Sequence, residues 1–179
     1  MGNKIFIISV FLLFHLKINA QNYIYKGDKK YECTDTWNFS LNASYWTGDP
    51  KITVAKNSKG GYLMISINVP FKSDSIRGTL TIILEDGTII KCLDKGVRDY
   101  VDRTSVNLYT LTTSEIESMK FSRISKIRFN IYRNNGVYEK GEYTPYTANN
   151  HKGSLFVSFN SDDKDYYDTD FEIYNLFDE

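Results

Sequence analysis

The sequence predicts a mainly all-β chain, an antiparallel β-sandwich with one short α-helix packed on it; a compact barrel is the alternative. Three observations lead to this fold class. Short runs rich in tyrosine, isoleucine, threonine, valine and phenylalanine recur along the chain, and these residue types favour pleated, half-buried surfaces. Turn-forming residues separate the runs closely enough for about eight to ten short strands. A single stretch carries a good helix-start signal.

Residues 1–20 differ in composition from the rest and have the pattern of a secretory signal peptide. Lys4 supplies a positive start, residues 5–16 are apolar, and Ala20 offers a small residue at a cleavage point before Gln21. The apolar run is short for a membrane span, although an uncleaved N-terminal anchor is the alternative. No cysteine follows it, so a lipoprotein anchor is not expected. The sequence therefore predicts a secreted or periplasmic protein in which residues 21–179 form a single β-sandwich domain.

Charge and hydropathy limit the partners of the mature chain. Removal of Lys4 and Lys17 from 22 basic residues leaves 20 against 22 acidic ones. A nearly neutral chain without a long basic run argues against nucleic acid as a partner. No second apolar run approaches membrane length, so no membrane insertion is expected after signal cleavage.

The N-terminal half reads as strands separated by turns. Residues 37–41 alternate large apolar and polar side chains, which predicts one half-buried strand. Residues 45–50 gather turn formers beside two aromatic rings and favour a loop. Two β-rich runs, 52–56 and 62–69, flank a glycine-containing loop at 57–61, and this arrangement predicts a hairpin.

The centre of the chain carries the clearest strand signals. Two apolar runs meet at Asp86 and Gly87, where glycine accepts the positive φ of a two-residue hairpin turn. Residues 97–103 then predict a short edge strand. Residues 124–132 alternate apolar and polar side chains, which predicts an amphipathic strand with one buried face.

The helix signal and the C-terminal segment complete the outline. Thr112 and Glu115 have the spacing of a capping box, which predicts a helix of about two turns. Residues 155–159 predict a further strand. The chain ends in an acidic, aromatic segment, 162–179, in which residues 171–177 are consistent with a last strand or a helical turn.

Both cysteines, Cys33 and Cys92, lie in the exported part of the chain. An oxidising compartment favours a disulfide between them, which would close a loop of about 60 residues and stabilise the fold by roughly 4 kcal/mol. The alternative is that Cys92, inside an apolar strand, is a small core residue.

The sequence lacks the residues that most kinds of catalytic site require. His151 is the single histidine after the signal and lies in a turn-like run, so neither a nucleophile–histidine pair nor a zinc site is expected. No phosphate-cradling glycine motif is present. The acidic residues at 162–172 have the density of a calcium site but fit no EF-hand register, and a solvated loop is preferred. We expect no catalytic residues, no cofactor and no metal.

Aromatic side chains in or beside predicted loops are the best candidates for ligand binding. Their rings could stack on sugars or anchor a protein interface. The alternative is that they cap the ends of the sheets. The candidates are Trp46, Tyr45, Tyr146, Tyr166 and Tyr167.

Parts of the chain resemble proteins of one bacterial group. The end of the signal at 18–21 is similar to secretory signals common in the Bacteroidetes. The runs 84–90, 109–112 and 124–128 resemble small exported or periplasmic β-rich proteins of that group, which are largely uncharacterised. The resemblance implies export and a β-rich fold and carries no active site.

These observations lead to two functional hypotheses. The first is an exported, non-catalytic binding or accessory module for a protein or a cell-surface glycan. The second is a secreted glycan hydrolase that uses two carboxylates, because acidic residues are plentiful. The missing catalytic sets favour a protein that is not an enzyme.

Overall fold

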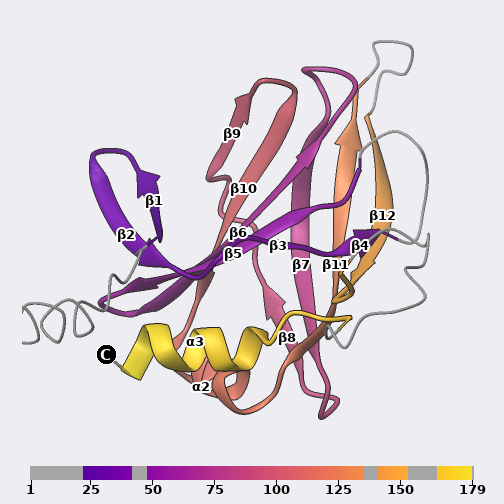
Figure 1. The fold of residues 1–179 in the computed structure, drawn as a ribbon. Helices are drawn as coiled ribbons and strands as arrows, with labels where there is room; N and C mark the ends of the chain where they lie inside the picture. Colours follow the sequence, from indigo (N-terminus) through magenta and orange to yellow (C-terminus); the bar gives the residue numbers. More distant parts are fainter. Residues whose placement is uncertain (1–21, 42–47, 135–140, 153–164, 179) are drawn as a thin grey trace, which may run out of the picture.

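The computed structural model describes residues 22–41, 48–134, 141–152 and 165–178. Within these residues the chain is mostly β-strand, arranged as two antiparallel sheets with two helices at one end (Figure 1). The expected signal peptide at 1–20 and the expected strand at 155–159 lie outside the described residues. No helix in the described part is long and apolar enough to cross a bilayer.

The larger sheet has the strand order β1-β2-β5-β6-β10-β9, and β3 also pairs with β5. All of these pairings are antiparallel. Strand β9 lies at the edge of the sheet, which confirms the edge strand predicted within 97–103. The strand bounds are β1 Asn22–Lys26, β2 Lys29–Cys33, β3 Trp37–Asn38, β5 Lys51–Asn57, β6 Gly60–Asn68, β9 Arg98–Val101 and β10 Thr104–Leu111.

The smaller sheet has the strand order β4-β12-β11-β7-β8, again with antiparallel pairings. The strands β7 and β8 form the hairpin predicted around Asp86 and Gly87, and Gly87 has a positive φ of 88°. The predicted two-residue turn is wrong: the Leu84 N–H donates to the Thr88 carbonyl at 2.9 Å, so Glu85, Asp86 and Gly87 form a three-residue loop, and Asp86 does not have a positive φ. The strand bounds are β4 Ser40–Leu41, β7 Ser75–Leu84, β8 Ile89–Cys92, β11 Ile124–Arg133 and β12 Glu142–Asn149.

One hydrophobic core draws side chains from both sheets and from both helices. In β11 the inward side chains are Ile127, Phe129 and Ile131, which confirms the predicted alternation. A smaller cluster formed by Ile24, Ala55 and Leu108 lies where the β1–β2 hairpin meets the rest of the larger sheet. The hairpin therefore has its own small apolar anchor.

The segment 37–41 joins the two sheets, so the prediction of a single strand there is wrong. Trp37–Asn38 pairs with β5 in the larger sheet, whereas Ser40–Leu41 pairs with β12 in the smaller one. Between them, the Phe39 backbone N–H donates to the Pro50 carbonyl at 3.1 Å. The alternation of buried side chains is retained, but the hydrogen-bonding partners change within five residues.

Helix α2 (Thr113–Phe121) begins at the predicted capping box. The Glu115 backbone N–H donates to the Thr112 hydroxyl at 3.3 Å, and the Thr112 N–H donates to the Glu115 carboxylate at 2.7 Å. Ile116 and Met119 are the buried residues of the helix. The helix gains its stability by placing these two side chains in the core.

The fold class with one short helix is corrected, because residues 169–178 form a second helix, α3 (Thr169–Asp178). Thr169 and Ile173 are buried and Phe177 packs against the core, so the buried face follows a helical spacing of four residues. The Thr169 hydroxyl accepts a hydrogen bond from the Ile124 N–H at 2.9 Å. Tertiary contacts therefore decide between the strand and the helical turn that the sequence left open.

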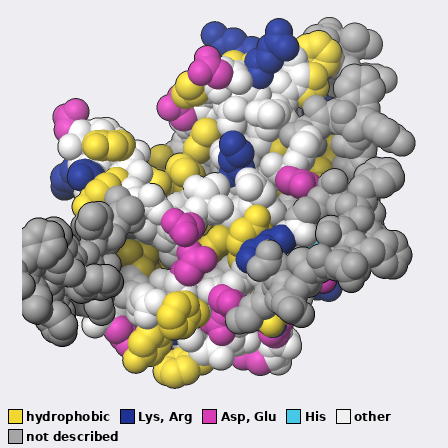
Figure 2. Space-filling model, in the orientation of Figure 1, with side chains coloured by type: hydrophobic (Ala, Val, Ile, Leu, Met, Phe, Trp, Pro, Cys, Tyr) yellow, Lys and Arg dark blue, Asp and Glu magenta, His cyan; other side chains and the backbone are white. Residues whose placement is uncertain are grey.

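Both helices approach β6 where it lacks a side chain. A Cβ added at Gly61 would lie 2.9 Å from a carbon of Ile116 in α2 and 3.2 Å from a carbon of Phe177 in α3. On the outer side of the helices, Phe121, Phe171 and Tyr174 are exposed. Figure 2 shows apolar side chains gathered over this end of the molecule.

Candidate functional site

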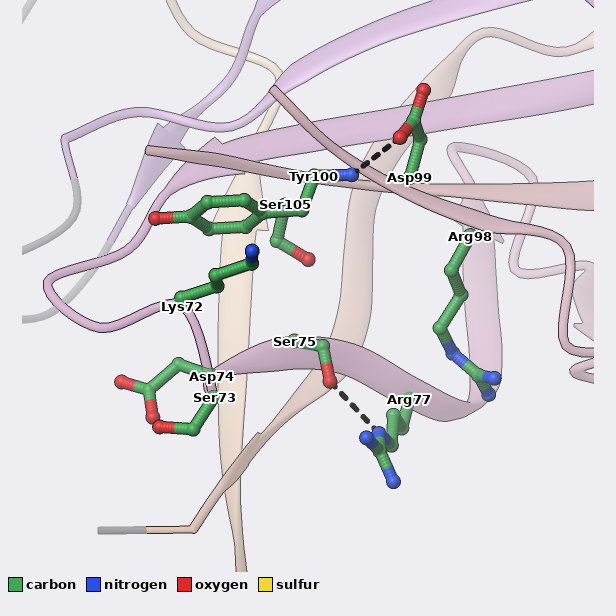
Figure 3. Close-up of a pocket in the computed structure, with 9 residues that line it drawn as sticks. All are labelled: Lys72, Ser73, Asp74, Ser75, Arg77, Arg98, Asp99, Tyr100 and Ser105. Carbon is green, nitrogen blue, oxygen red and sulfur yellow. Dashed lines mark hydrogen bonds between the residues drawn. The ribbon is translucent and has the colours of Figure 1, made fainter. Parts of the chain in front are cut away.

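A polar pocket of about 410 Å³ lies where the start of β7 faces β9 and β10 (Figure 3). Its walls come from both sheets and from the loop that precedes β7. The side chains that matter for its chemistry are Lys72, Asp74, Arg77, Arg98, Asp99, Tyr100 and Ser105.

The pocket lies beside a length of β7 that has no neighbouring strand on one edge. Strand β8 pairs with residues 80–83 of β7 and leaves the preceding residues without a strand on that side. Side chains from the other sheet take its place at Ile76. The Ile76 N–H donates to the Ser105 hydroxyl at 2.9 Å, and the Ile76 carbonyl accepts from Arg98 Nε at 3.1 Å and Asn107 Nδ2 at 3.3 Å.

Side chains also take the place of a neighbouring strand at Gly78. Its N–H donates to Asp94 Oδ2 at 2.7 Å, and its carbonyl accepts from the Tyr109 hydroxyl at 2.9 Å. Burial opposes the charged form of Asp94, but the N–H groups of Gly96 and Gly78 and the Arg98 guanidinium outweigh it and hold the pKa of Asp94 below its usual range. Asp94, Tyr109 and the side chains around Ile76 therefore have a structural role, because buried backbone groups need partners.

Asp74 has no comparable structural explanation. The residue is 1% exposed, and neither carboxylate oxygen accepts a hydrogen bond of normal geometry from the described residues. Burial raises the pKa of Asp74, although the Arg133 charge and the Ser73 hydroxyl are near enough to favour its charged form. A buried carboxylate without hydrogen-bond donors is destabilising, and such groups often mark functional sites.

The predicted binding residue Tyr146 does not line the Asp74 pocket; it belongs to the core and lines a different pocket, beside Arg128 and Thr147. It belongs to β12 rather than to a loop, is 8% exposed, and stacks on Phe129 with ring centroids 5.8 Å apart. The Arg133 guanidinium donates to its hydroxyl at 2.7 Å. The expected loop position of Tyr146 is therefore wrong, and its hydroxyl holds the arginine whose charge reaches Asp74.

The predicted residues Tyr166 and Tyr167 lie elsewhere, just before α3. Tyr166 faces the Arg123 guanidinium, with 3.5 Å from its carbon to the ring centroid, and Tyr167 stacks on Phe39 at 6.2 Å. Arg123, which Tyr166 faces, lies just before the start of β11, whereas Tyr146 pairs with Phe129 in the middle of that strand. The structure therefore does not bring Tyr166 and Tyr167 together with Tyr146. Two further candidates, Tyr45 and Trp46, lie outside the described residues.

Tyr167 lines a second pocket, of about 520 Å³, that contains two carboxylates. Glu172 of α3 accepts hydrogen bonds from Trp37 Nε1 at 3.0 Å and from the Asp35 backbone N–H at 3.2 Å. Burial raises the pKa of Glu172, and the nearby Asp35 charge adds to the effect, whereas the Lys152 charge opposes it. The hydrogen bonds also explain the position of Glu172, because they tie α3 to the segment 35–37.

The cysteines are free thiols in the structure, so the expected disulfide between Cys33 and Cys92 is not present. Cys33 lies in β2 beside the small cluster, and Cys92 is buried in β8 of the other sheet. Burial raises the pKa of Cys33 to about 11 and that of Cys92 to about 12. Cys92 is therefore a core residue, the alternative that the sequence left open.

Metal ligands do not gather in the described part of the chain, where no group of three or more histidine, cysteine, aspartate or glutamate side chains has a geometry able to hold an ion. Residues 162–164 of the acidic segment lie outside that part. No family model, curated protein or solved structure was found that matches this chain. Its function is therefore inferred from its pockets.

The residues of the Asp74 pocket escaped the sequence prediction. The run 72–75 contains Lys, Ser, Asp and Ser, which is typical of an exposed loop. One signal was available, because Asp74 precedes the inward residue Ile76 by two positions and strands alternate with a period of two. Extending the strand pattern backwards from Ile76 would have placed Asp74 on the buried face.

Proposed function

We propose that the protein is an exported, non-catalytic module that binds a glycan through the Asp74 pocket. The observation that carries this proposal is a carboxylate, 1% exposed, that lines a pocket and lacks a donor among the described residues. Hydroxyl groups of a sugar would supply the missing donors, and hydrogen bonds to charged groups are stronger than those between neutral groups.

The other walls suit the same ligand class. Figure 3 shows the Tyr100 ring and the Lys72 side chain on one side of the pocket, with Asp74, Ser75 and Arg77 on the other. Sugar hydroxyls donate and accept, which matches a pocket that offers both carboxylate acceptors and cationic donors. A volume of about 410 Å³ is within the range of small-ligand sites.

Two features of the chain support the export and the β-sandwich fold that this proposal assumes. The basic and apolar pattern of residues 1–20 supports export. The single core that draws on both sheets supports a β-sandwich in which the sheets lie face to face. In that arrangement, the Asp74 pocket would lie at the end of the interface between the sheets where β7 and β10 present polar side chains.

Glycan binding is tested with a glycan array, followed by calorimetry on the best ligand. The variant Asp74→Asn keeps the shape of the side chain and removes its charge, and it should weaken binding by about tenfold, the equivalent of one lost charged hydrogen bond. Asp28→Asn, in the exposed turn between β1 and β2, is the matched control. Capture of a protein but no glycan would overturn the proposal, as would full affinity in Asp74→Asn.

The second candidate function is glycan hydrolysis at the other pocket, and the carboxylates of Asp35 and Glu172 favour it. A glutamate whose pKa is raised by burial and whose position is held by Trp37 has the properties of a general acid. Turnover of labelled polysaccharides that is lost in Glu172→Gln and kept in Glu32→Gln would support it. Glu32 is an exposed residue of β2. No turnover by the folded protein would exclude this function for the substrates tested.

A further inference from the structure

We infer that the Asp74 pocket recognises an anionic sugar, one that carries a carboxylate or a sulfate group. This inference rests on the proposed glycan-binding function and adds the class of sugar. It follows from two cationic side chains of the pocket, Lys72 and Arg77, which form no ion pair with a described residue although Asp74 and Asp99 also line the pocket.

The three cations of the pocket differ in their partners. Arg98 forms an ion pair with Asp94 and also donates to the Ile76 carbonyl, so its charge and its position are explained by the fold. Lys72 and Arg77 have no carboxylate within ion-pair distance anywhere in the described ranges. Two unpaired cations beside one pocket would bind an anionic group.

Arg77 is also held in place before any ligand arrives. Its Nε donates to the Ser75 hydroxyl at 2.8 Å, and its guanidinium carbon lies 4.3 Å from the centroid of the Tyr132 ring. These contacts use one N–H group and one face of the guanidinium. The terminal N–H groups can still form the paired hydrogen bonds that carboxylate and sulfate oxygens accept, with little loss of side-chain entropy.

The arrangement of charges separates the sugar hydroxyls from the anionic group. In Figure 3 the Asp74 carboxylate lies beside Ser73, the Arg77 guanidinium lies further along the same side of the pocket, and the Lys72 ammonium lies across from them, near Tyr100 and Ser105. A sugar acid can direct hydroxyls to Asp74 and its anionic group to Arg77.

Other ligand classes fit this arrangement less well. A divalent cation at Asp74 would be repelled by Lys72, Arg77 and Arg133. The ammonium group of a zwitterionic amino acid would be repelled by the Lys72 and Arg77 charges that line the same pocket. A neutral sugar would leave Lys72 and Arg77 without a partner.

Calorimetry with four probes tests the inference: a glucuronic acid-containing oligosaccharide, its glucose-containing counterpart, a sulfated oligosaccharide and free glucuronic acid. The acidic oligosaccharide should bind at least about tenfold more tightly than the neutral one, and its advantage should shrink as salt is raised. Either the carboxylated or the sulfated probe can show this advantage, and the comparison identifies which group is preferred. Binding of free glucuronic acid would show that one sugar is sufficient.

Variants locate the effect within the pocket. Arg77→Ala and Lys72→Ala should each remove most of the preference for the acidic probe. The matched control Arg128→Gln, an exposed arginine of β11 that lines a different pocket, should keep it. Lys72 is an exposed loop residue, so its variant should fold normally even if Arg77→Ala does not.

The outcomes separate this inference from the proposed function. Equal binding of the acidic and neutral oligosaccharides would overturn the anionic class and leave glycan binding intact. Binding of neither, by folded protein, would overturn both. A preference for acidic probes that survives in both Arg77→Ala and Lys72→Ala would place the recognition outside this pocket and would also overturn the inference.

Discussion

Replacing Asp74 with asparagine should make the folded protein more stable at neutral pH. Burial raises the pKa of Asp74, so folding favours the protonated carboxyl over the charged one. The stability that this proton contributes is fully present below the ordinary aspartate pKa of about 3.9 and is lost as the pH rises through the raised folded-state value. At neutral pH the native protein therefore contains a charge that is unfavourable to folding, and asparagine removes it.

The expected gain follows from the surroundings of the side chain. Asp74 is 1% exposed and has no hydrogen-bond donor of normal geometry among the described residues, so removing its charge relieves desolvation. The loss of attraction to Arg133 and of the favourable effect of the Ser73 hydroxyl offsets part of this relief. The net gain should be about 1 kcal/mol, which corresponds to a rise in melting temperature of about 2–4 °C for a domain of this size.

The assay is thermal unfolding of the wild type and Asp74→Asn across a pH series. The difference between them should be largest at neutral pH and should disappear in acid, where the wild-type carboxyl is protonated. The exposed control Asp28→Asn should not change the melting temperature. A lower melting temperature for Asp74→Asn at neutral pH would refute the reasoning, because it would mean that attraction to Arg133 outweighs the desolvation of the carboxylate.

Four further predictions concern the scaffold. Tyr109→Phe should destabilise the protein by about 1–3 kcal/mol in chemical denaturation, because it removes the hydroxyl that donates to the Gly78 carbonyl; no change would show that the edge of β7 does not need this partner. Thr112→Ala should cost about 1 kcal/mol and Thr112→Ser much less, measured in the same way, since serine can also cap the helix. Mass spectrometry of the protein alkylated after unfolding without reductant should show two free thiols at Cys33 and Cys92; a mass without alkylation would show the disulfide instead. In the native protein, alkylation of both thiols at neutral pH should be slow, because burial raises both pKa values to about 11 and about 12.

The sequence was sufficient to predict the features that depend only on residues close together in the chain. The hairpin at 84–88, the capping box at Thr112 and the alternation along β11 depend on neighbours in sequence, and the structure confirms each of them, although the hairpin loop has three residues rather than the predicted two. The segment 37–41 and helix α3 were harder to predict. Their hydrogen-bonding partners, β12 for Ser40–Leu41 and Ile124 for Thr169, are remote in the chain.

The pocket was beyond sequence reasoning for a related physical reason. A polar residue in a loop is normally solvated, so the burial of Asp74 depends on the approach of the other sheet. The polar side chains of β10 gave no sign that they would substitute for a missing strand at Ile76. The aromatic residues are binding candidates by their type alone, yet Tyr146 is in the core and Tyr167 packs against Phe39.

The unpaired edge of β7 has a consequence for the behaviour of the protein at high concentration. Bare strand edges can recruit a strand from another molecule and begin aggregation. At Ile76 and Gly78 the side chains of Ser105, Asn107 and Tyr109 occupy the backbone groups that an incoming strand would need. Shortening these side chains would therefore do more than weaken the fold, because it would free backbone groups of β7 to which a strand of another molecule could hydrogen-bond.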